Sequence, residues 1–289
     1  MKAIIGTIII FASVLGGFAA QGGHIISLWQ PFEFIILIGA AFGGFLISNP
    51  MSVVAQSFKA VPRLFSGKTY SQDDYLDVLG FMYELFVKAR KEGLMAIESD
   101  IEEPEESPLF QKYPKILENH HAVEFVCDYM RLAVSGSMNP FELDNLMDIE
   151  INTHHHEAAA AAHAVQRVSD GLPAFGIVAA VLGIVHTMAA LDGPLEEIGK
   201  LVAAALVGTF TGILGAYAFV GPMAVFMERL ADEETRLLSC LRACILANFQ
   251  GYNPQMAVEF GRKTMTAELR PSFIELEEHL RGGGSSSAA

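Results

Sequence analysis

The chain has 289 residues, of which 52% are hydrophobic and only 18% are charged, so a single soluble core of ordinary composition is excluded and membrane spans are expected. The 33 Asp and Glu residues outnumber the 19 Lys and Arg residues, and the resulting net charge of −14 argues against nucleic acid as a ligand. The three cysteines, Cys127, Cys240 and Cys244, form no CxxC pair and are too few for a disulfide framework, so free thiols in a reducing compartment are expected.

Four uncharged stretches predict membrane-spanning helices, because a bilayer crossing needs about 20 apolar residues. They cover residues 3–20, 31–49, 172–191 and 201–227. The apolar core of the second stretch, residues 34–47, is short. We retain it because an odd number of spans would place one charged block on the outer side of the membrane.

The distribution of Lys and Arg predicts the orientation of these spans. The connections 21–32 and 192–200 carry none and one, whereas the blocks 50–170 and 228–281 carry ten and seven. Both large blocks, and both termini, are therefore predicted to be cytoplasmic. No small-residue cleavage site follows the first span, so we expect an anchor rather than a removed signal peptide.

The predicted fold is all-α, with four transmembrane helices, a large helical cytoplasmic domain and no sheet. Its expected parts are a transmembrane hairpin (1–49), a cytoplasmic helical domain (50–170), a second hairpin (171–227), a cytoplasmic helical segment (228–281) and a tail (282–289). The tail has the composition of an added linker and is left out of the fold prediction.

Local signals also predict helices inside the cytoplasmic blocks. Ser71 and Asp74 form an S-x-x-D capping signal, and Gly93 is expected to end the helix that they begin. Residues 118–131 and 158–162 also predict helix.

Small residues recur at four-residue spacing within three of the spans, a pattern that lets helix backbones approach closely in lipid. The pairs are Gly39 and Gly43, Gly176 and Ala180, and Gly208 and Gly212. Packing within this chain and packing against another subunit explain the pattern equally well.

The third and fourth spans contain no carboxylate, although ion transfer through hydrocarbon usually uses one. His186 lies about 20 Å along the third helix from Pro173, close to the outer surface, so an interfacial histidine is preferred over a relay. Glu33, at the outer end of the second span, is expected to be interfacial and solvated. An ion-binding acid would therefore have to come from a partner.

Three residues of the spans are candidates for coupling. Pro173 follows a Ser-Asp-Gly sequence and is expected in the first turn of a new helix. Pro222 has an apolar helical pattern on both sides and is expected to kink its helix where membrane meets cytoplasm. Thr209, beside Gly208, is the preferred candidate for facing a partner's ion-binding group.

The cytoplasmic blocks carry two further candidate groups. Arg90 closes the capped helix and Glu98 opens the acidic run 98–106, and a cluster of this kind is usually a solvated surface. The histidines at 120, 121, 154–156 and 163 suggest metal binding, but consecutive histidines diverge around a helix and no cysteine lies nearby, so no metal site is predicted.

Several longer motifs carry a resemblance to a known family. They are QPFEFIILIGA, SGSMNPFELDNLMD, LPAFGIVAAVLGIVH, VGTFTGILGAYAF, GYNPQMAVEFGRKT and RPSFIELEEHLR. With these motifs, the chain resembles over nearly its whole length the motility protein A (MotA) family of proton-driven flagellar motor stator subunits, within the MotA/TolQ/ExbB superfamily.

This resemblance implies an ion-conducting machine of the bacterial inner membrane rather than an enzyme. Five subunits would form a ring around a pair of MotB subunits, whose membrane helix supplies the protonatable aspartate. Proton flow would turn the ring and drive the rotor protein FliG, with no cofactor beyond the coupling proton. The resemblance implies that Pro173 and Pro222 take part in the ion-driven conformational change. It further implies that Thr209 lies near the MotB aspartate and that Arg90 and Glu98 face FliG.

Three alternatives stay open. An energiser of the ExbB or TolQ type would power outer-membrane processes, although that group typically has three spans. A metal-dependent membrane enzyme would use the histidine cluster. A membrane scaffold would conduct no ions at all.

Overall fold

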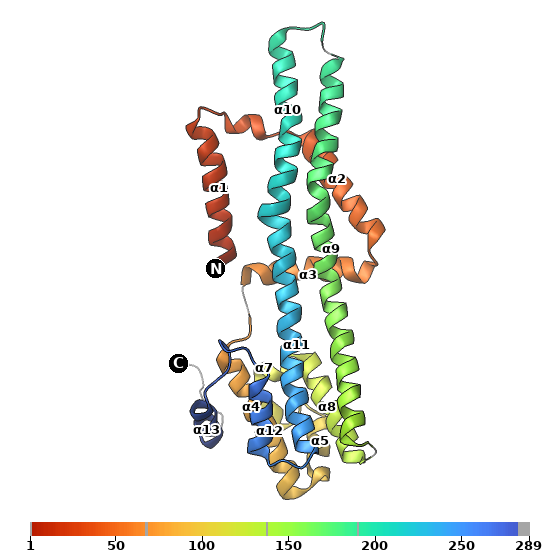
Figure 1. Ribbon diagram of the computed structural model, residues 1–289, viewed down its shortest axis with the longest axis vertical. Coiled ribbons are helices and arrows are strands. Elements are labelled where there is room, and N and C mark those ends of the chain that lie inside the picture. The colour runs from red at the N-terminus through yellow and green to blue at the C-terminus, as the bar shows by residue number, and fades with distance from the viewer. Residues whose placement is uncertain (1, 67–68, 137, 190, 283–289) are drawn as a thin grey trace. The chain divides into compact units, whose positions relative to one another are not determined.

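The described part of the computed structural model consists of helices joined by turns and loops and contains no strand, which confirms the all-α prediction (Figure 1). The described residues are 2–66, 69–136, 138–189 and 191–282. The linker-like tail therefore lies outside them from residue 283 onward. The chain divides into two compact units: Met1–Lys68 with Glu157–Ala231, and Thr69–His156 with Asp232–Ala289.

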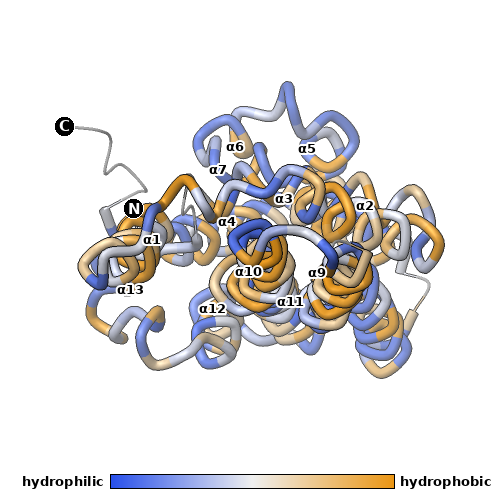
Figure 2. The backbone as a smooth tube through the Cα atoms, turned by 90° about the horizontal axis from the view of Figure 1, so that it is seen from above, coloured by the Kyte–Doolittle hydropathy of each residue, from blue (hydrophilic) through white to orange (hydrophobic). Residues whose placement is uncertain are grey.

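The first unit contains the apolar helices. They are α1 (Lys2–Ala20), η1 (Ile25–Leu28), α2 (Pro31–Ser48), α3 (Met51–Ser66), the second half of α9 (Pro140–Met188), α10 (Leu195–Leu214), the π-helical turn η3 (Gly215–Val220) and the start of α11 (Gly221–Phe249). Figure 2 shows α9 and α10 side by side, with hydrophobic residues along much of both.

Four helical stretches of the described chain are long and apolar enough to cross a membrane, which confirms the number of spans predicted. They are Ala3–Ala20, Ile25–Ser48, Pro140–Met188 and Leu195–Phe249. The last two have 49 and 55 residues, about 75 and 80 Å at 1.5 Å per residue, whereas the hydrocarbon layer is about 30 Å thick. Each therefore extends well beyond the bilayer.

The prediction that a new helix begins near Pro173 is wrong. Helix α9 continues through this residue from Pro140 to Met188. The polar residues before it find partners without leaving the helix: the Ser169 hydroxyl donates to the carbonyl oxygen of Ala216 at 2.9 Å, and Asp170 accepts from Gln166 at 2.8 Å. Tertiary contacts thus override the local helix-ending signal.

Pro222 lies inside one continuous helical stretch, as predicted, and the π-helical turn η3 ends two residues before it. A proline within a helix lacks the N–H of an ordinary turn, and its ring clashes with a carbonyl of the preceding turn. In the π turn just before Pro222, the backbone hydrogen-bonding pattern differs from that of an α-helix. The carbonyl oxygen of Ala216, within this turn, accepts a hydrogen bond from the Ser169 hydroxyl. The kink itself stays a prediction.

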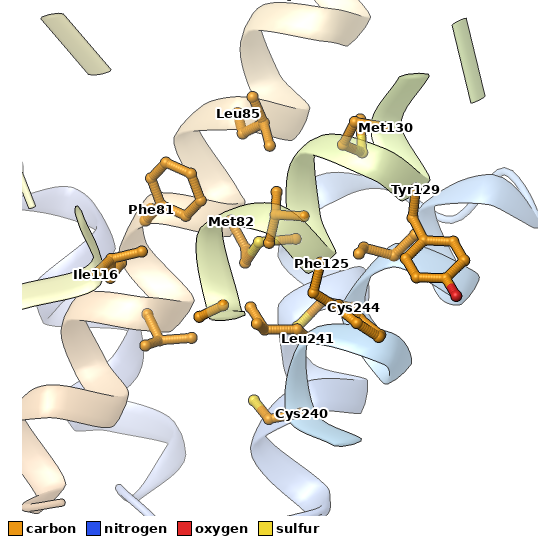
Figure 3. Close-up of a cluster of buried hydrophobic side chains, with 14 of the residues drawn as sticks. Phe81, Met82, Leu85, Ile116, Phe125, Tyr129, Met130, Cys240, Leu241 and Cys244 are labelled. Carbon is orange, nitrogen blue, oxygen red and sulfur yellow. The ribbon is translucent and has the colours of Figure 1, made fainter. Parts of the chain in front are cut away.

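The second unit is a helical domain built around one apolar core. Its elements are α4 (Gln72–Glu92), η2 (Leu94–Ile97), α5 (Glu98–Glu102), α6 (Pro108–Gln111), α7 (Pro114–Leu117), α8 (His120–Ser135), the first part of α9, the end of α11, α12 (Pro254–Lys263) and α13 (Phe273–Arg281). Figure 3 shows side chains of α4, α7, α8 and α11 meeting in this core, among them Phe81, Met82, Phe125 and Leu241. All three cysteines are free and buried, as expected for thiols.

The capping prediction for α4 is confirmed. The Ser71 hydroxyl accepts from the backbone N–H of Asp74 at 3.3 Å, and the Asp74 carboxylate accepts from the backbone N–H of Ser71 at 2.7 Å. Gly93 ends the helix with φ = 93°, a conformation that favours glycine.

Candidate functional site

Helices α9 and α10 meet along a seam of glycines. A Cβ atom added to Gly176 would lie 2.9 Å from the carbonyl oxygen of Gly208, and one added to Gly212 would lie 2.7 Å from that of Leu172. Only glycine therefore allows the two backbones to come this close. The close packing predicted for the third and fourth spans is confirmed.

The glycines of α2 behave differently. A Cβ atom on Gly39 or Gly43 would meet nothing within 4 Å. The buried face of α2 is instead formed by Glu33, Leu37 and residues one and two turns further on. The glycine face of α2 is thus left uncovered by the described residues of this chain.

Thr209 lies in the α9–α10 seam, directly after Gly208. It is half-buried, and its hydroxyl donates to the carbonyl oxygen of Gly176 across the seam at 3.3 Å. The contact is at the long end of hydrogen-bond geometry. A small separation of the two helices would release this hydroxyl for another acceptor.

Glu33 is not the solvated carboxylate that the sequence predicted. It is only 9% exposed and lies where α2 meets the seam. A Cβ atom on Gly208 would lie 2.8 Å from Glu33 Oε2, and one on Gly183 would lie 3.3 Å from Oε1. Oε2 has no hydrogen-bond partner among the described residues. By contrast, His186 is exposed, in keeping with the interfacial position expected for it.

A signal for the burial of Glu33 was present in the sequence. Glu33, Leu37, Ala41 and Phe45 recur at four-residue spacing and share one helix face, and all four are buried. The strong apolar character of α2 on all sides hid this face, because no polar stripe marks the opposite one.

The two prolines lie on either side of a second hydrogen bond between these helical segments, from Ser169 to Ala216. Pro173 lies one turn after Ser169 on α9, and Pro222 lies six residues after Ala216, which accepts the hydrogen bond of Ser169. Ser169 is buried, and a Cβ atom on Gly221 would come within 3.2 Å of its hydroxyl. A cleft of about 570 Å³ opens beside this link, lined by Gln166, Ser169, Tyr217, Gly221, Pro222, Val225, Phe226 and Arg229.

In the second unit, Arg90 and Glu98 are both exposed. Arg90 lies in the last turn of α4 and Glu98 is the first residue of α5. Neither side chain forms an ion pair within the described part of the chain. Their charges are therefore available to a partner.

An ion pair between a half-buried lysine and a buried carboxylate joins these two helix ends. Asp100 is only 3% exposed, and its carboxylate accepts from Lys88 of α4 at 2.6 Å and from the Ser107 hydroxyl at 2.7 Å. Lys88 lies two residues before Arg90, and Asp100 lies two residues after Glu98. The Lys88–Asp100 pair therefore fixes the relative position of the two segments that carry the exposed charges.

Replacement of Asp100 by asparagine should loosen this segment. Removing one partner of a buried pair is strongly destabilising, but Lys88 is one-third exposed and solvent screens the pair, so we expect a reduced local destabilisation of about 1.4 kcal/mol. Amide hydrogen exchange in η2 and α5 should then be about tenfold faster in the variant. The exposed Glu103→Gln is the matched control, and equal exchange in D100N and wild type would contradict the role of the pair.

The histidines do not converge. The rings of His121 and His154 lie edge to face at 4.7 Å, and His155 Nδ1 lies 3.0 Å from the hydroxyl of Thr235. Among the described residues, no group of three or more His, Cys, Asp or Glu side chains could hold a metal ion.

The chain is similar to known proteins along almost its whole length. The Motility protein A N-terminal family model matches residues 4–93, and the MotA/TolQ/ExbB proton channel family model matches residues 118–239. Motility protein A of Salmonella typhimurium is 45% identical over 97% of this chain and 95% of its own length. Motility protein A of Escherichia coli is 44% identical with the same coverage.

A solved structure, that of C. jejuni MotAB, shares the fold. It superposes with a TM-score of 0.76 over 92% of this chain and 96% of that chain, at 21% sequence identity. The chain matches a family of proton channels, and four of its helices are long and apolar enough to span a membrane. It is therefore a multi-pass membrane protein of a channel family and not an enzyme. The chain belongs to the motility protein A family, within the MotA/TolQ/ExbB proton channel family.

Proposed function

We propose that this chain is a stator subunit of the bacterial flagellar motor, which forms a proton-conducting complex with a MotB partner in the inner membrane and drives the rotor protein FliG. The observation that carries this proposal is the 45% identity to a motility protein A along almost the whole of both chains. The match of residues 4–93 to the motility protein A N-terminal model favours this function over an ExbB or TolQ energiser.

In the proposed mechanism, a protonatable acid of MotB lies near Thr209. Proton binding there changes the packing of the α9–α10 seam, and Pro173 and Pro222 allow the helices to adjust. The driving force is adequate, because moving one charge through 100 mV supplies about 2.3 kcal/mol. The continuity of α9 and α11 between the two units supports this coupling, since the same helices pass through both.

Assembly is proposed as a ring of five subunits around a MotB pair, with both termini in the cytoplasm. The uncovered face of α2 around Gly39 and Gly43 supports a further helix packing there. Arg90 and Glu98 would then contact FliG through charge complementarity, which mainly sets specificity and association rate.

Complementation tests the proposed function. Expression of this chain in a strain that lacks its own stator subunit should restore swimming when a cognate MotB is present. Swimming should persist without sodium and stop when a protonophore collapses the proton gradient. Restoration of outer-membrane energisation instead, in a strain lacking ExbB or TolQ, would favour the alternative.

A further inference from the structure

We infer that Glu33 is a second proton-binding group of the pathway, which takes up the coupling proton where α2 meets the α9–α10 seam and passes it toward the partner's acid. The inference rests on the proposed function, because it assigns a step within the same pathway. It concerns a residue of this chain rather than of MotB.

The position of the carboxyl group carries the argument. Its two oxygens lie over Gly183 of α9 and Gly208 of α10, so it contacts both helices of the seam at once. Gly208 directly precedes Thr209, whose hydroxyl crosses the same seam. Glu33 and the residue proposed to face the partner's acid therefore lie next to each other on the seam.

Glycine makes room for this carboxyl group. A side chain at Gly208 would collide with Glu33 Oε2 and with Ala179, and one at Gly183 would collide with Ala205. The two glycines thus form a recess that the carboxyl group fills. It is nine-tenths buried there and keeps one oxygen without a hydrogen bond within the described chain.

Within the described part of the chain, no Lys, Arg or His side chain forms an ion pair with this group. From residue 3 to residue 58 the sequence contains no Lys or Arg. The titratable side chains on the outer parts of the elements around Glu33 are all exposed: His24 before η1, His186 on α9, and Glu196, Glu197 and Lys200 on α10. Lys200 is paired with Glu196 at 2.7 Å.

A buried carboxyl group without a partner is costly in apolar surroundings, so such residues within membrane proteins typically serve ion or proton transfer. A leucine in this place would fill the recess at lower cost. The carboxyl group has a use here if it binds a proton, moves with the seam and releases the proton again.

Proton flux through the complete complex with MotB tests the inference. The complex is reconstituted in liposomes that enclose a pH-sensitive dye, and a pH gradient is applied. We expect Glu33→Gln, which keeps the size but cannot titrate, to lower the flux about tenfold, since a positioned proton-transfer group typically contributes at least that much. Its flux should also lose the dependence on external pH that wild type shows. Glu33→Asp should recover much of the flux.

The controls separate this inference from the proposed function. Glu197→Gln, an exposed carboxylate on α10, should conduct as wild type does. A wild-type complex that conducts no better than empty liposomes would refute the proposed function itself. A conducting wild type together with an E33Q complex of equal flux and equal pH profile would overturn only the role of Glu33.

A second measurement needs no variant and covers the case in which E33Q does not assemble. A hydrophobic carbodiimide adds protonated carboxyl groups across its C=N bond, so treatment of the wild-type complex should modify Glu33. Peptide mass spectrometry should show less of the adduct as pH rises between about 5 and 8, the range in which a cycling carboxyl group can titrate. Glu33 that stays unmodified throughout this range would overturn the inference.

Discussion

Replacement of Gly212 by valine is expected to abolish the assembled complex. The first added carbon would lie 2.7 Å from the carbonyl oxygen of Leu172 and 3.1 Å from the Cα of Gly176, both of them backbone atoms that cannot rotate away. Helices α9 and α10 would have to separate, and overpacking of this severity belongs among the exceptional losses of more than about 4 kcal/mol. The yield of complex that co-purifies with MotB measures the effect.

The control for this substitution lies on the same helix. Gly199→Val adds the same side chain at an exposed position where a Cβ atom would meet nothing within 4 Å. We expect normal yield and normal swimming from G199V. Wild-type yield from G212V would show that the glycine seam is not required for assembly.

Charge reversal at Arg90 should abolish most swimming without reducing the amount of complex in the membrane. Arg90 is exposed and makes no ion pair among the described residues, so Arg90→Glu should change folding stability by no more than about 0.5 kcal/mol. At a charged interface, however, a like-charge contact disfavours docking. Swimming speed and membrane content, measured on the same cells, separate the two effects.

The neighbouring Lys91 supplies the comparison, because Lys91→Glu changes net charge equally on an exposed side chain one residue away. K91E should retain more swimming than R90E. A compensating charge change on FliG should restore the speed of R90E cells. Normal swimming of R90E with the rotor unchanged would refute the proposed contact.

The sequence predicts what depends on local composition. Four spans, the all-α fold and the Ser71 cap follow from apolar length and short-range hydrogen bonds, and the structure has all of them. Pro173 and Glu33 were misjudged because their environments depend on contacts with distant segments. Ser169 is satisfied by Ala216, and Glu33 is buried by Gly183 and Gly208, and no short window contains either pairing.

For the candidate rotor-binding residues, too, the sequence predicts the local features but not the contacts between separate segments. The helix-ending signal at Gly93 correctly separated Arg90 from Glu98, and their exposure follows from their position at helix ends. The Lys88–Asp100 pair that joins these ends was not predicted, since Asp100 looked like one acid in a run of several. Their role toward the rotor came from the family resemblance and stays a prediction.

The buried cysteines make the native chain suitable for site-specific labelling. Burial raises the pKa of the Cys127 thiol to about 11, and contact with Cys240 together with burial raises that of Cys244. The thiolate is the reactive form and all three thiols are buried, so they should resist maleimide at neutral pH. A cysteine introduced at Glu98 would then accept a fluorophore selectively, so that motion of this segment against the rotor could be followed without first removing the native thiols.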